Sequence, residues 1–407
     1  MDLKNVLFDK SIHFLALMLS GMILLPAIVE SILIALLVII LVIKMLVTKN
    51  IPPFDKRLFF FCGFYLILLA SALLSNNLTE GTSKAKTMVS LFIFPLVFLF
   101  FLRNNKEIIK IKEKVLWVNY ASCVIFSFIS GIAFFLYKNP RYPKKDANFF
   151  RNAVDSIQII GDHPIYISLL ISISIIIGFY FLNKHYRTNI KYSTMLVFCQ
   201  LLQLSILFLL MSKAIIFAML IALVVLFILQ RKWKLIVILF SISSVLLLVV
   251  PDKNNRFIEL FSYETYSQLD TYNSTSIRFN IFKCNLKILR ERPIFGYGLG
   301  DVNDKLGSCL SKVFTNERSN YNSHNQYLNI ILSTGIFGLI YFLFFLFLYF
   351  KVAFSHQDNL LNAILIIFCV SFLFENVLSR QTGVVAFSFF INYLYFCSKN
   401  FLKNEIN

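Results

Sequence analysis

Long apolar stretches recur along the whole chain and are separated by shorter polar segments. Each stretch holds 15 to 24 residues, close to the roughly 20 residues that a helix needs to cross a bilayer. The pattern therefore predicts an all-α, polytopic membrane protein with about twelve transmembrane helices. The predicted spans are 12–29, 31–47, 58–75, 88–102, 115–137, 164–182, 193–211, 214–229, 233–250, 327–350, 360–377 and 383–397.

Two apolar tracts, 12–47 and 193–229, are too long for one crossing each. Glu30 interrupts the first tract and Lys213 interrupts the second, so we expect a turn at each of these residues.

Two polar segments, 138–163 and 251–326, exceed the usual length of a connection, and such loops are usually functional or disordered. The longer segment contains a helical pattern, so we expect it to be folded and to carry the chemistry. The predicted organisation is an N-terminal bundle of about nine spans over 1–250, the large loop over 251–326 between spans 9 and 10, and about three C-terminal spans over 327–407.

The distribution of lysine and arginine predicts the orientation. With the N-terminus in the cytoplasm, the inner segments carry 20 of these residues and the outer segments carry 19. Ten of the outer ones belong to 251–326, and long loops are largely exempt from the positive-inside rule. Without this loop the count is 20 against 9, which favours cytoplasmic N- and C-termini. No cleavage site follows the first apolar stretch, so we expect that stretch to be retained.

Composition supports the membrane assignment, because 58% hydrophobic and 15% charged residues exclude an ordinary soluble globular domain. A net charge of +18 would suit a nucleic-acid partner, but the basic residues are scattered through the loops, and topology explains them better. We therefore expect no nucleic acid. Five of the seven cysteines lie in predicted spans as small apolar residues. Cys284 and Cys309 share the long loop and could form a disulfide or stay as two thiols.

Residues 276–293 have the pattern of an amphipathic helix that lies against the membrane or caps the bundle. Lys283, Lys287 and Arg290 fall within one polar sector of this helix. Arg278 falls on the opposite, apolar side, where an unpaired charge would be costly. Two interpretations stay open: Arg278 is solvated because the helix starts later, or it has a buried anionic partner.

The segment PIFGYGLGD, from Pro293 to Asp301, carries three alternating glycines. A nucleotide loop is disfavoured, because no strand precedes the segment and no nucleotide pool is expected outside the membrane. We expect a tight turn in which the backbone closely approaches a ligand or a helix. Asp301 and Asp304 alone are poor evidence for a metal, so we predict no metal site.

His324 stands directly before an apolar tract. We expect Ser323 to be the N-cap, which would place His324 in the first helical turn. The helix dipole disfavours an imidazolium there, so His324 should stay neutral and able to accept a proton. The same helix end attracts phosphate oxygens. The alternative is an interfacial histidine that only caps the helix.

Four further polar residues accompany apolar segments. Lys213 lies between apolar stretches, as a functional cation or as a lysine that snorkels to the interface. Glu375 lies inside a predicted span, where it pairs with a cation of the bundle or contacts substrate, and Arg380 follows at the outer mouth. His163 precedes a proline at the start of a span, where capping explains it and substrate contact is the alternative.

The candidate cations and the histidines fall on the outer membrane face in this topology. Such a set suits a lipid-linked anion together with a hydroxyl group that must be activated. We find no Ser/His/Asp order, metal-ligand cluster or P-loop in the sequence.

These residues, in order and spacing, resemble the O-antigen ligase and polymerase superfamily of bacterial membrane glycosyltransferases. The resemblance covers about 220 residues of the second half, whereas the first 150 match only in hydropathy. Its motifs are HPIYIS from His163, Ser212 with Lys213, Arg278, ERPIFGYGLGD, NSHNQYLNIILSTGIFGL from Asn322, and EN..LSRQTG from Glu375.

The resemblance implies a ligase that transfers a glycan from undecaprenyl pyrophosphate to a sugar hydroxyl of lipid A core, at the periplasmic face of the bacterial inner membrane, without nucleotide or metal. His324 matches the family's general base, and Arg278 matches an arginine that binds the donor pyrophosphate. The family's second pyrophosphate arginine is replaced by Lys213, which keeps the charge but loses the bidentate fork. We expect Arg380, Glu375 and His163 to contact substrate, and the displacement to invert the anomeric centre.

Four alternatives stay open, one of which is a non-catalytic assembly protein. A repeat-unit polymerase shares the donor and topology but uses another lipid-linked glycan as acceptor, and a protein O-glycosyltransferase uses a protein. A transporter of lipid-linked glycans is the third, although such proteins usually have related halves and midplane sites, for which the sequence gives no sign.

Overall fold

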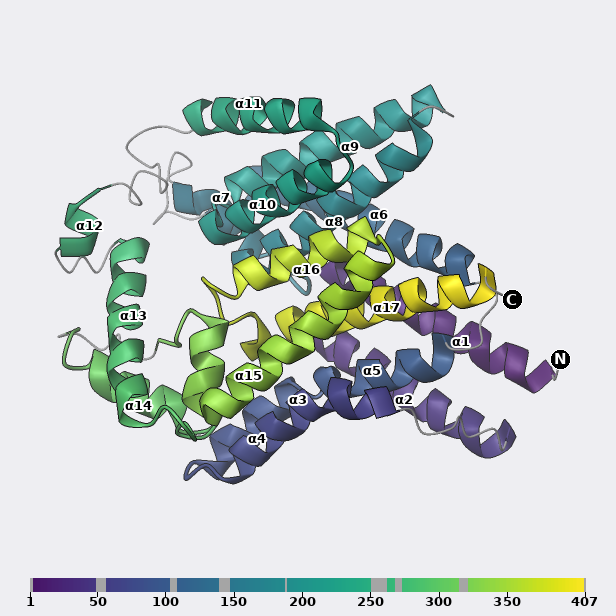
Figure 1. Cartoon of the computed structure of the whole chain (residues 1–407). Helices are drawn as coiled ribbons and strands as arrows, with labels where there is room; N and C mark the ends of the chain where they lie inside the picture. Colours follow the sequence, from purple (N-terminus) through teal and green to yellow (C-terminus); the bar gives the residue numbers. More distant parts are fainter. Residues whose placement is uncertain are drawn as a thin grey trace.

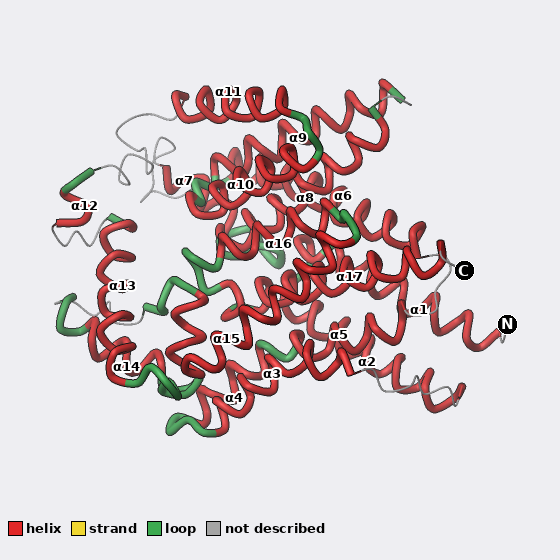
Figure 2. The backbone as a smooth tube through the Cα atoms, in the orientation of Figure 1, coloured by secondary structure: helices red, strands yellow, loops and turns green. Residues whose placement is uncertain are grey.

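The computed structural model describes residues 3–48, 56–102, 108–138, 147–186, 189–249, 262–267, 273–314 and 321–405. All regular structure in these ranges is helical (Figure 2), which confirms the predicted all-α class. The helices are α1 (Leu3–Ser20), η1 (Met22–Leu24), α2 (Ala27–Thr48), α3 (Lys56–Leu73), α4 (Leu78–Thr87), α5 (Ser90–Leu102), α6 (Ile108–Leu136), α7 (Ala147–Asp155), α8 (Pro164–His185), α9 (Ile190–Leu209), α10 (Lys213–Leu229), α11 (Trp233–Val249), α12 (Glu264–Ser267), α13 (Ser274–Glu291), α14 (Val302–Leu310), α15 (Gln326–Ser355), α16 (Asn359–Ser371), η4 (Val377–Ser379) and α17 (Gln381–Glu405).

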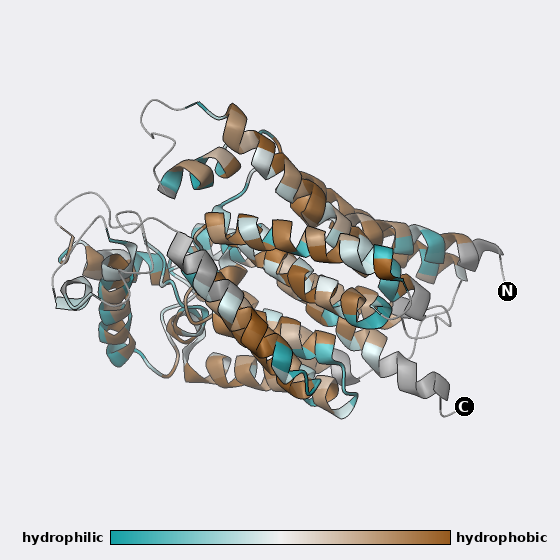
Figure 3. Ribbon diagram, turned by 90° about the horizontal axis from the view of Figure 1, so that it is seen from above, coloured by the Kyte–Doolittle hydropathy of each residue, from teal (hydrophilic) through white to brown (hydrophobic). Residues whose placement is uncertain are grey.

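Several helices are long and apolar enough to cross a membrane. Among the described residues six qualify by length and composition, and three shorter apolar helices accompany them. The six are Ala27–Thr48, Leu78–Phe100, Ile111–Leu136, Pro164–His185, Ile190–Leu209 and Gln326–Ser355. In Figure 3 the bundle helices are mostly apolar, and polar positions are frequent in the elements beyond one end. All twelve predicted spans overlap helices, but the count of twelve crossings stays a prediction.

The two expected turns have different outcomes. The turn at Lys213 is confirmed, because α9 ends at Leu209 and α10 begins at Lys213. The turn at Glu30 is wrong: α1 ends at Ser20, and Glu30 lies inside α2 with only 1% of its surface exposed. Pro26 explains the shift, since it lacks an N–H and cannot continue α1, while its carbonyl accepts the N–H of Glu30 at 3.2 Å.

Helices α1 to α11 and α15 to α17 form a bundle, and α13 runs across one of its ends (Figure 1). Helix α17 lies in the middle of the bundle and packs against α5, α6, α15 and α16. Its side chains from Val384 to Cys397 are all buried, as expected of a helix that is apolar on every face. The start of α1 and the end of α17 lie at the end of the bundle opposite α13.

The described part of the long loop is folded, as expected. Helix α13 confirms the amphipathic helix, and its buried Ile281 and Ile288 share a small apolar core with α14. A disulfide joins Cys284 in α13 to Cys309 in α14, with Cα atoms 5.9 Å apart, which decides between the two states left open for these cysteines.

The glycine segment after α13 forms the expected tight turn, and it approaches helices. The N–H groups of Tyr297 and Gly298 donate to the carbonyls of Leu332 and Ser333 in α15, at 2.7 and 3.0 Å. At the same place Gly335 (φ 71°) kinks α15, and a Cβ there would lie 1.8 Å from the carbonyl oxygen of Ile294. The turn therefore fastens the loop to the bundle at a position that only glycine fits.

Asp301 ends this turn and anchors it to the start of α4. Its carboxylate accepts the N–H groups of Asn76 and Asn77 at 2.8 and 2.7 Å. These bonds occupy both oxygens, and within the described ranges no group of three His, Cys, Asp or Glu residues is placed to hold a metal ion.

Candidate functional site

A cavity of about 660 Å³ opens where α13 meets the start of α10 and the segments before α15 and after α16. It brings together four of the six residues singled out from the sequence: Lys213, Arg278, His324 and Glu375. We call it the Glu375 cavity. The rest of its lining is largely apolar and includes Phe208, Phe217, Leu220, Phe279, Phe282 and Phe374.

Glu375 bridges the two residues that matter most for the expected chemistry. Its Oε2 lies 2.9 Å from Nη2 of Arg278, and its Oε1 lies 3.2 Å from Nδ1 of His324. Glu375 is 5% exposed, so Arg278 does have a buried anionic partner, one of the two interpretations above. The ion pair also places Arg278 beside His324 in one cavity.

The charge of Glu375 is maintained by these neighbours. Burial alone would raise the pKa of its carboxyl group, but the hydrogen bond from His324 and the charges of His324 and Arg278 hold the pKa below its ordinary value. A carboxylate only accepts hydrogen bonds, so Nδ1 of His324 carries the proton. When the ring of His324 is neutral, Nε2 is then the nitrogen that can accept a proton.

The backbone at His324 differs from the expectation. The N-cap of α15 is Asn325, whose side chain accepts the N–H of Leu328 at 2.9 Å, and not Ser323. His324 therefore precedes the helix, in a left-handed conformation with φ 45°. The expected place in the first helical turn was wrong, because Asn325, two residues after Ser323, caps the helix.

Glu375 also lies elsewhere than expected. The predicted span 360–377 is wrong at its end, because α16 stops at Ser371 and Glu375 lies in the non-helical segment before η4. Gln326 ties this segment to the start of α15. Its N–H donates to the carbonyl of Phe372 at 2.8 Å, and its Oε1 accepts the N–H of Leu378 at 2.9 Å. These bonds hold Glu375 beside His324.

Two further cations line the cavity. Lys213, the first residue of α10, donates from Nζ to Oγ1 of Thr275 in α13 at 3.2 Å. Arg151, from α7, donates from Nη1 to the carbonyl of Leu210 at 2.5 Å. Arg151 was missed from the sequence, because nothing in the 138–163 segment separates it from the other basic residues there.

The comparison with known protein families bears on this site. Residues 198–343 match the model of a family described as O-antigen ligase. This part of the chain is similar to the O-antigen ligase family. The match confirms the resemblance seen in the motifs, and the matched region includes Lys213, Arg278 and His324. It supports a membrane glycosyltransferase of the ligase or polymerase kind, acting on a lipid-linked glycan and an acceptor in general. No curated protein matches the chain.

His163 and Arg380 lie outside the Glu375 cavity. His163 caps α8, where its Nδ1 accepts the N–H of Ile165 at 3.4 Å. Burial, followed by the charges of Arg380 and Arg151, lowers its pKa and favours the neutral ring. Arg380 lines a second cavity, of about 260 Å³, with Asp162.

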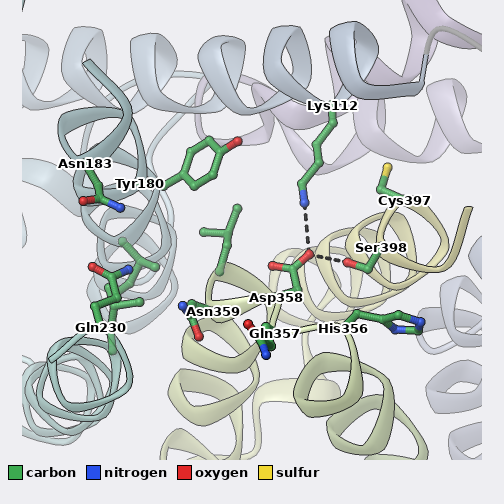
Figure 4. Close-up of a pocket in the computed structure, with 13 residues that line it drawn as sticks. Lys112, Tyr180, Asn183, Gln230, His356, Gln357, Asp358, Asn359, Cys397 and Ser398 are labelled. Carbon is green, nitrogen blue, oxygen red and sulfur yellow. Dashed lines mark hydrogen bonds and ion pairs between the residues drawn. The ribbon is translucent and has the colours of Figure 1, made fainter. Parts of the chain in front are cut away.

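A third cavity, of about 390 Å³, lies at the other end of α15 and contains none of the predicted site residues. Figure 4 shows its polar lining around Asp358, which pairs with Lys112 at 3.0 Å and accepts the hydroxyl of Ser398. Asp358 also caps α16 by accepting the N–H of Leu361 at 3.0 Å. These contacts join α6, α16 and α17, so the carboxylate is occupied by bonds within the bundle.

Proposed function

We propose that the protein transfers a glycan from undecaprenyl pyrophosphate to a sugar hydroxyl of lipid A core at the outer face of the bacterial inner membrane. The observation that carries the proposal is the buried Glu375, which joins Arg278 and His324 in one cavity with Lys213. A base for a hydroxyl and cations for a pyrophosphate are what such a transfer needs.

The reaction we propose is a single in-line displacement that inverts the anomeric carbon, and metal has no part in it. The acceptor oxygen forms the new bond to the anomeric carbon while the bond from that carbon to the pyrophosphate oxygen breaks. The hydroxyl proton passes to Nε2 of His324, and a positioned base adds typically about 10² to 10⁴-fold. Undecaprenyl pyrophosphate leaves with the negative charge, which Arg278 and Lys213 stabilise.

The walls of the cavity support a lipid-linked donor. A small neighbouring cavity of about 60 Å³ shares Phe208 and Leu220 with the Glu375 cavity. Its other lining residues are apolar and come from α8 to α11. Apolar side chains therefore continue from the cationic site along the bundle, and such a surface suits a prenyl chain because it presents no polar group to the hydrocarbon.

The disulfide supports the outer face. Disulfides persist in oxidising compartments such as the bacterial periplasm, and Cys284–Cys309 lies in the loop elements that cover the Glu375 cavity. The start of α1 and the end of α17 lie together at the opposite end (Figure 1), as cytoplasmic N- and C-termini require.

The test is a strain that lacks the protein, complemented with wild type, with His324→Ala or with His356→Ala as a matched control. His356 lies at the far end of α15 from His324, so the His356→Ala variant should restore the surface glycan, as wild type does. We expect His324→Ala to leave bare lipid A core and glycans accumulated on undecaprenyl pyrophosphate, at normal protein abundance. Core capped with a single repeat unit would establish a polymerase instead. Full complementation by His324→Ala would refute the catalytic base.

A further inference from the structure

The Arg380 cavity is a second polar hollow at the same end of the bundle as the Glu375 cavity. The starts of α2, α8 and α17 form it, and its polar side chains are Asp162, Arg380, Gln381 and Thr382. Apart from these its lining is glycine, proline and apolar residues. Nothing in the proposed chemistry has used this cavity.

Its polar groups are held in place by contacts with one another. Asp162 accepts the hydroxyl of Thr382 at 2.7 Å and lies 3.9 Å from Nη1 of Arg380. Gln381 donates from Nε2 to Oγ of Ser31 at 2.7 Å. A set of fixed donors and acceptors of this kind matches the hydroxyl groups of a sugar.

Arg380 keeps its donors available. Its side chain is 57% exposed, and its guanidinium lies over the ring of Tyr166, with Cζ 5.6 Å from the ring centroid. Among the described residues it forms only the long ion pair with Asp162 and no hydrogen bond. Five N–H groups are thus presented on a supported, planar surface.

Near the start of α2, the buried side chain of Glu30 has an oxygen without a hydrogen bond among the described residues. Glu30 is 1% exposed, and its Oε2 has no hydrogen-bond partner among the described residues. It lies one turn after Ala27, which lines the Arg380 cavity, on the same face of α2. Buried polar groups are normally bonded, so this oxygen calls for water or a ligand group.

The Arg380 and Glu375 cavities lie on two sides of one thin wall. The chain from Glu375 to Arg380 runs from one to the other, and five residues span at most about 18 Å. The chain at the start of α8 also passes between the two cavities, because Asp162 lines the Arg380 cavity and Ile165 lines the Glu375 cavity. Tyr166 crosses the wall: its hydroxyl donates to the carbonyl of Asn376 at 3.4 Å, and its ring supports Arg380.

We propose that the Arg380 cavity binds the acceptor glycan, as a polyhydroxylated sugar held next to the residue whose hydroxyl reacts. This rests on the proposed function. The cations that suit a pyrophosphate and the apolar walls lie in the Glu375 cavity, which keeps the donor there. The Arg380 cavity lies across the wall from these groups, so a sugar held there would leave the neighbouring sugar of the same glycan to reach over the wall to Nε2 of His324. The mixed charge of Arg380 and Asp162 suits sugar hydroxyls better than a pyrophosphate.

The test measures initial transfer rates of the purified protein, with undecaprenyl-pyrophosphate-linked glycan and purified lipid A core titrated separately. Arg380→Gln should raise the KM for lipid A core about tenfold, the loss expected of one charge-assisted hydrogen bond, and leave the KM for the donor unchanged. Arg380→Lys should lie between this variant and wild type, because it keeps the charge without the fork. Arg290→Gln, an exposed change on α13, should alter neither KM.

Three results would overturn the proposal. A raised donor KM in Arg380→Gln would assign the cavity to the donor glycan, and unchanged KM values in a monodisperse Arg380→Gln would leave it without a role in binding. If the wild type transfers no glycan to lipid A core, the proposed function itself fails, and the acceptor site fails with it.

Discussion

Replacing Glu375 by glutamine tests whether a buried carboxylate organises the site. The change keeps the size and shape of the side chain but removes its charge. Arg278 then lacks its anionic partner, and Nδ1 of His324 faces an amide that can either donate or accept. The tautomer that leaves Nε2 free to accept a proton is therefore no longer enforced.

Two magnitudes follow from the geometry. Breaking a fully buried ion pair costs about 3–5 kcal/mol, but 35% of the Arg278 side chain is exposed, so water compensates part of the loss and we expect about 1–2 kcal/mol. Transfer should fall by about 10² to 10⁴-fold, the range of a positioned general base. Activity is thus expected to fall far more than stability.

The effect on stability should depend on pH. The pKa of Glu375 lies below its ordinary value in the folded protein, so the carboxylate contributes stability above its unfolded pKa of about 4.3. That contribution is lost as the pH falls through the folded value. The difference in unfolding temperature between wild type and Glu375→Gln should be complete at pH 7 and shrink below about pH 4.

The assay combines thermal unfolding in detergent at several pH values with glycan transfer at pH 7. Glu80→Gln is the matched control, because Glu80, whose side chain is 44% exposed, pairs with Lys84 at 3.3 Å, and a pair near the surface is worth about 0–1 kcal/mol. Transfer by folded Glu375→Gln within threefold of wild type would refute the orienting role. An equal loss of stability at pH 7 and pH 3 would refute the ion pair as its cause.

Two further changes test contacts that hold the fold and take no direct part in the proposed transfer. The Cys284–Cys309 disulfide has a sequence separation of 25 residues, for which the chain-entropy model gives about 3.5 kcal/mol of stabilisation. The double Cys→Ser variant should therefore lose about 2–4 kcal/mol of stability, and protease should cleave α13 faster than in wild type. Equal proteolysis of the two proteins would contradict this prediction. Asp358→Asn leaves the partly buried Lys112 without its anion, so it should lower the unfolding temperature in a thermal scan and leave the KM values for both substrates unchanged. An unchanged unfolding temperature would show that the ion pair adds nothing to stability.

The hydropathy pattern predicted the fold class because a helix that crosses or lines a bundle needs an apolar surface along most of its length. The hydropathy pattern gave a wrong position for the turn between α1 and α2, because polarity does not cause that turn. Glu30 has the polarity of a turn residue but lies buried in α2, while the chain actually turns before it at Gly21 to Pro26. A buried carboxylate inside a helix cannot be told from a turn by polarity alone, so backbone signals such as proline decide.

Local sequence signals predicted only part of the site. The motifs identified the chemical groups, and a charge on an apolar face predicted a partner for Arg278, but nothing local identified the partner. Glu375 lies 97 residues away along the chain and reaches Arg278 because Gln326 bonds to both sides of its segment. His163 and Arg380 lie outside the Glu375 cavity, and Arg380 lines a separate cavity, an arrangement that only the packing of α8 and α17 reveals.

Because Asn325 caps α15 in place of Ser323, the group that decides the protonation of His324 changes. In the first helical turn, the dipole would disfavour the imidazolium wherever the ring pointed. Outside the helix, the left-handed backbone costs about 1–3 kcal/mol, a strain that surrounding bonds must offset. Those bonds run from His324 N–H to Asn322 and from the Ser323 hydroxyl to Asn376, beside Glu375. In this position the protonation of His324 depends on the Glu375 carboxylate and not on the helix dipole. The carboxylate fixes which ring nitrogen carries the proton.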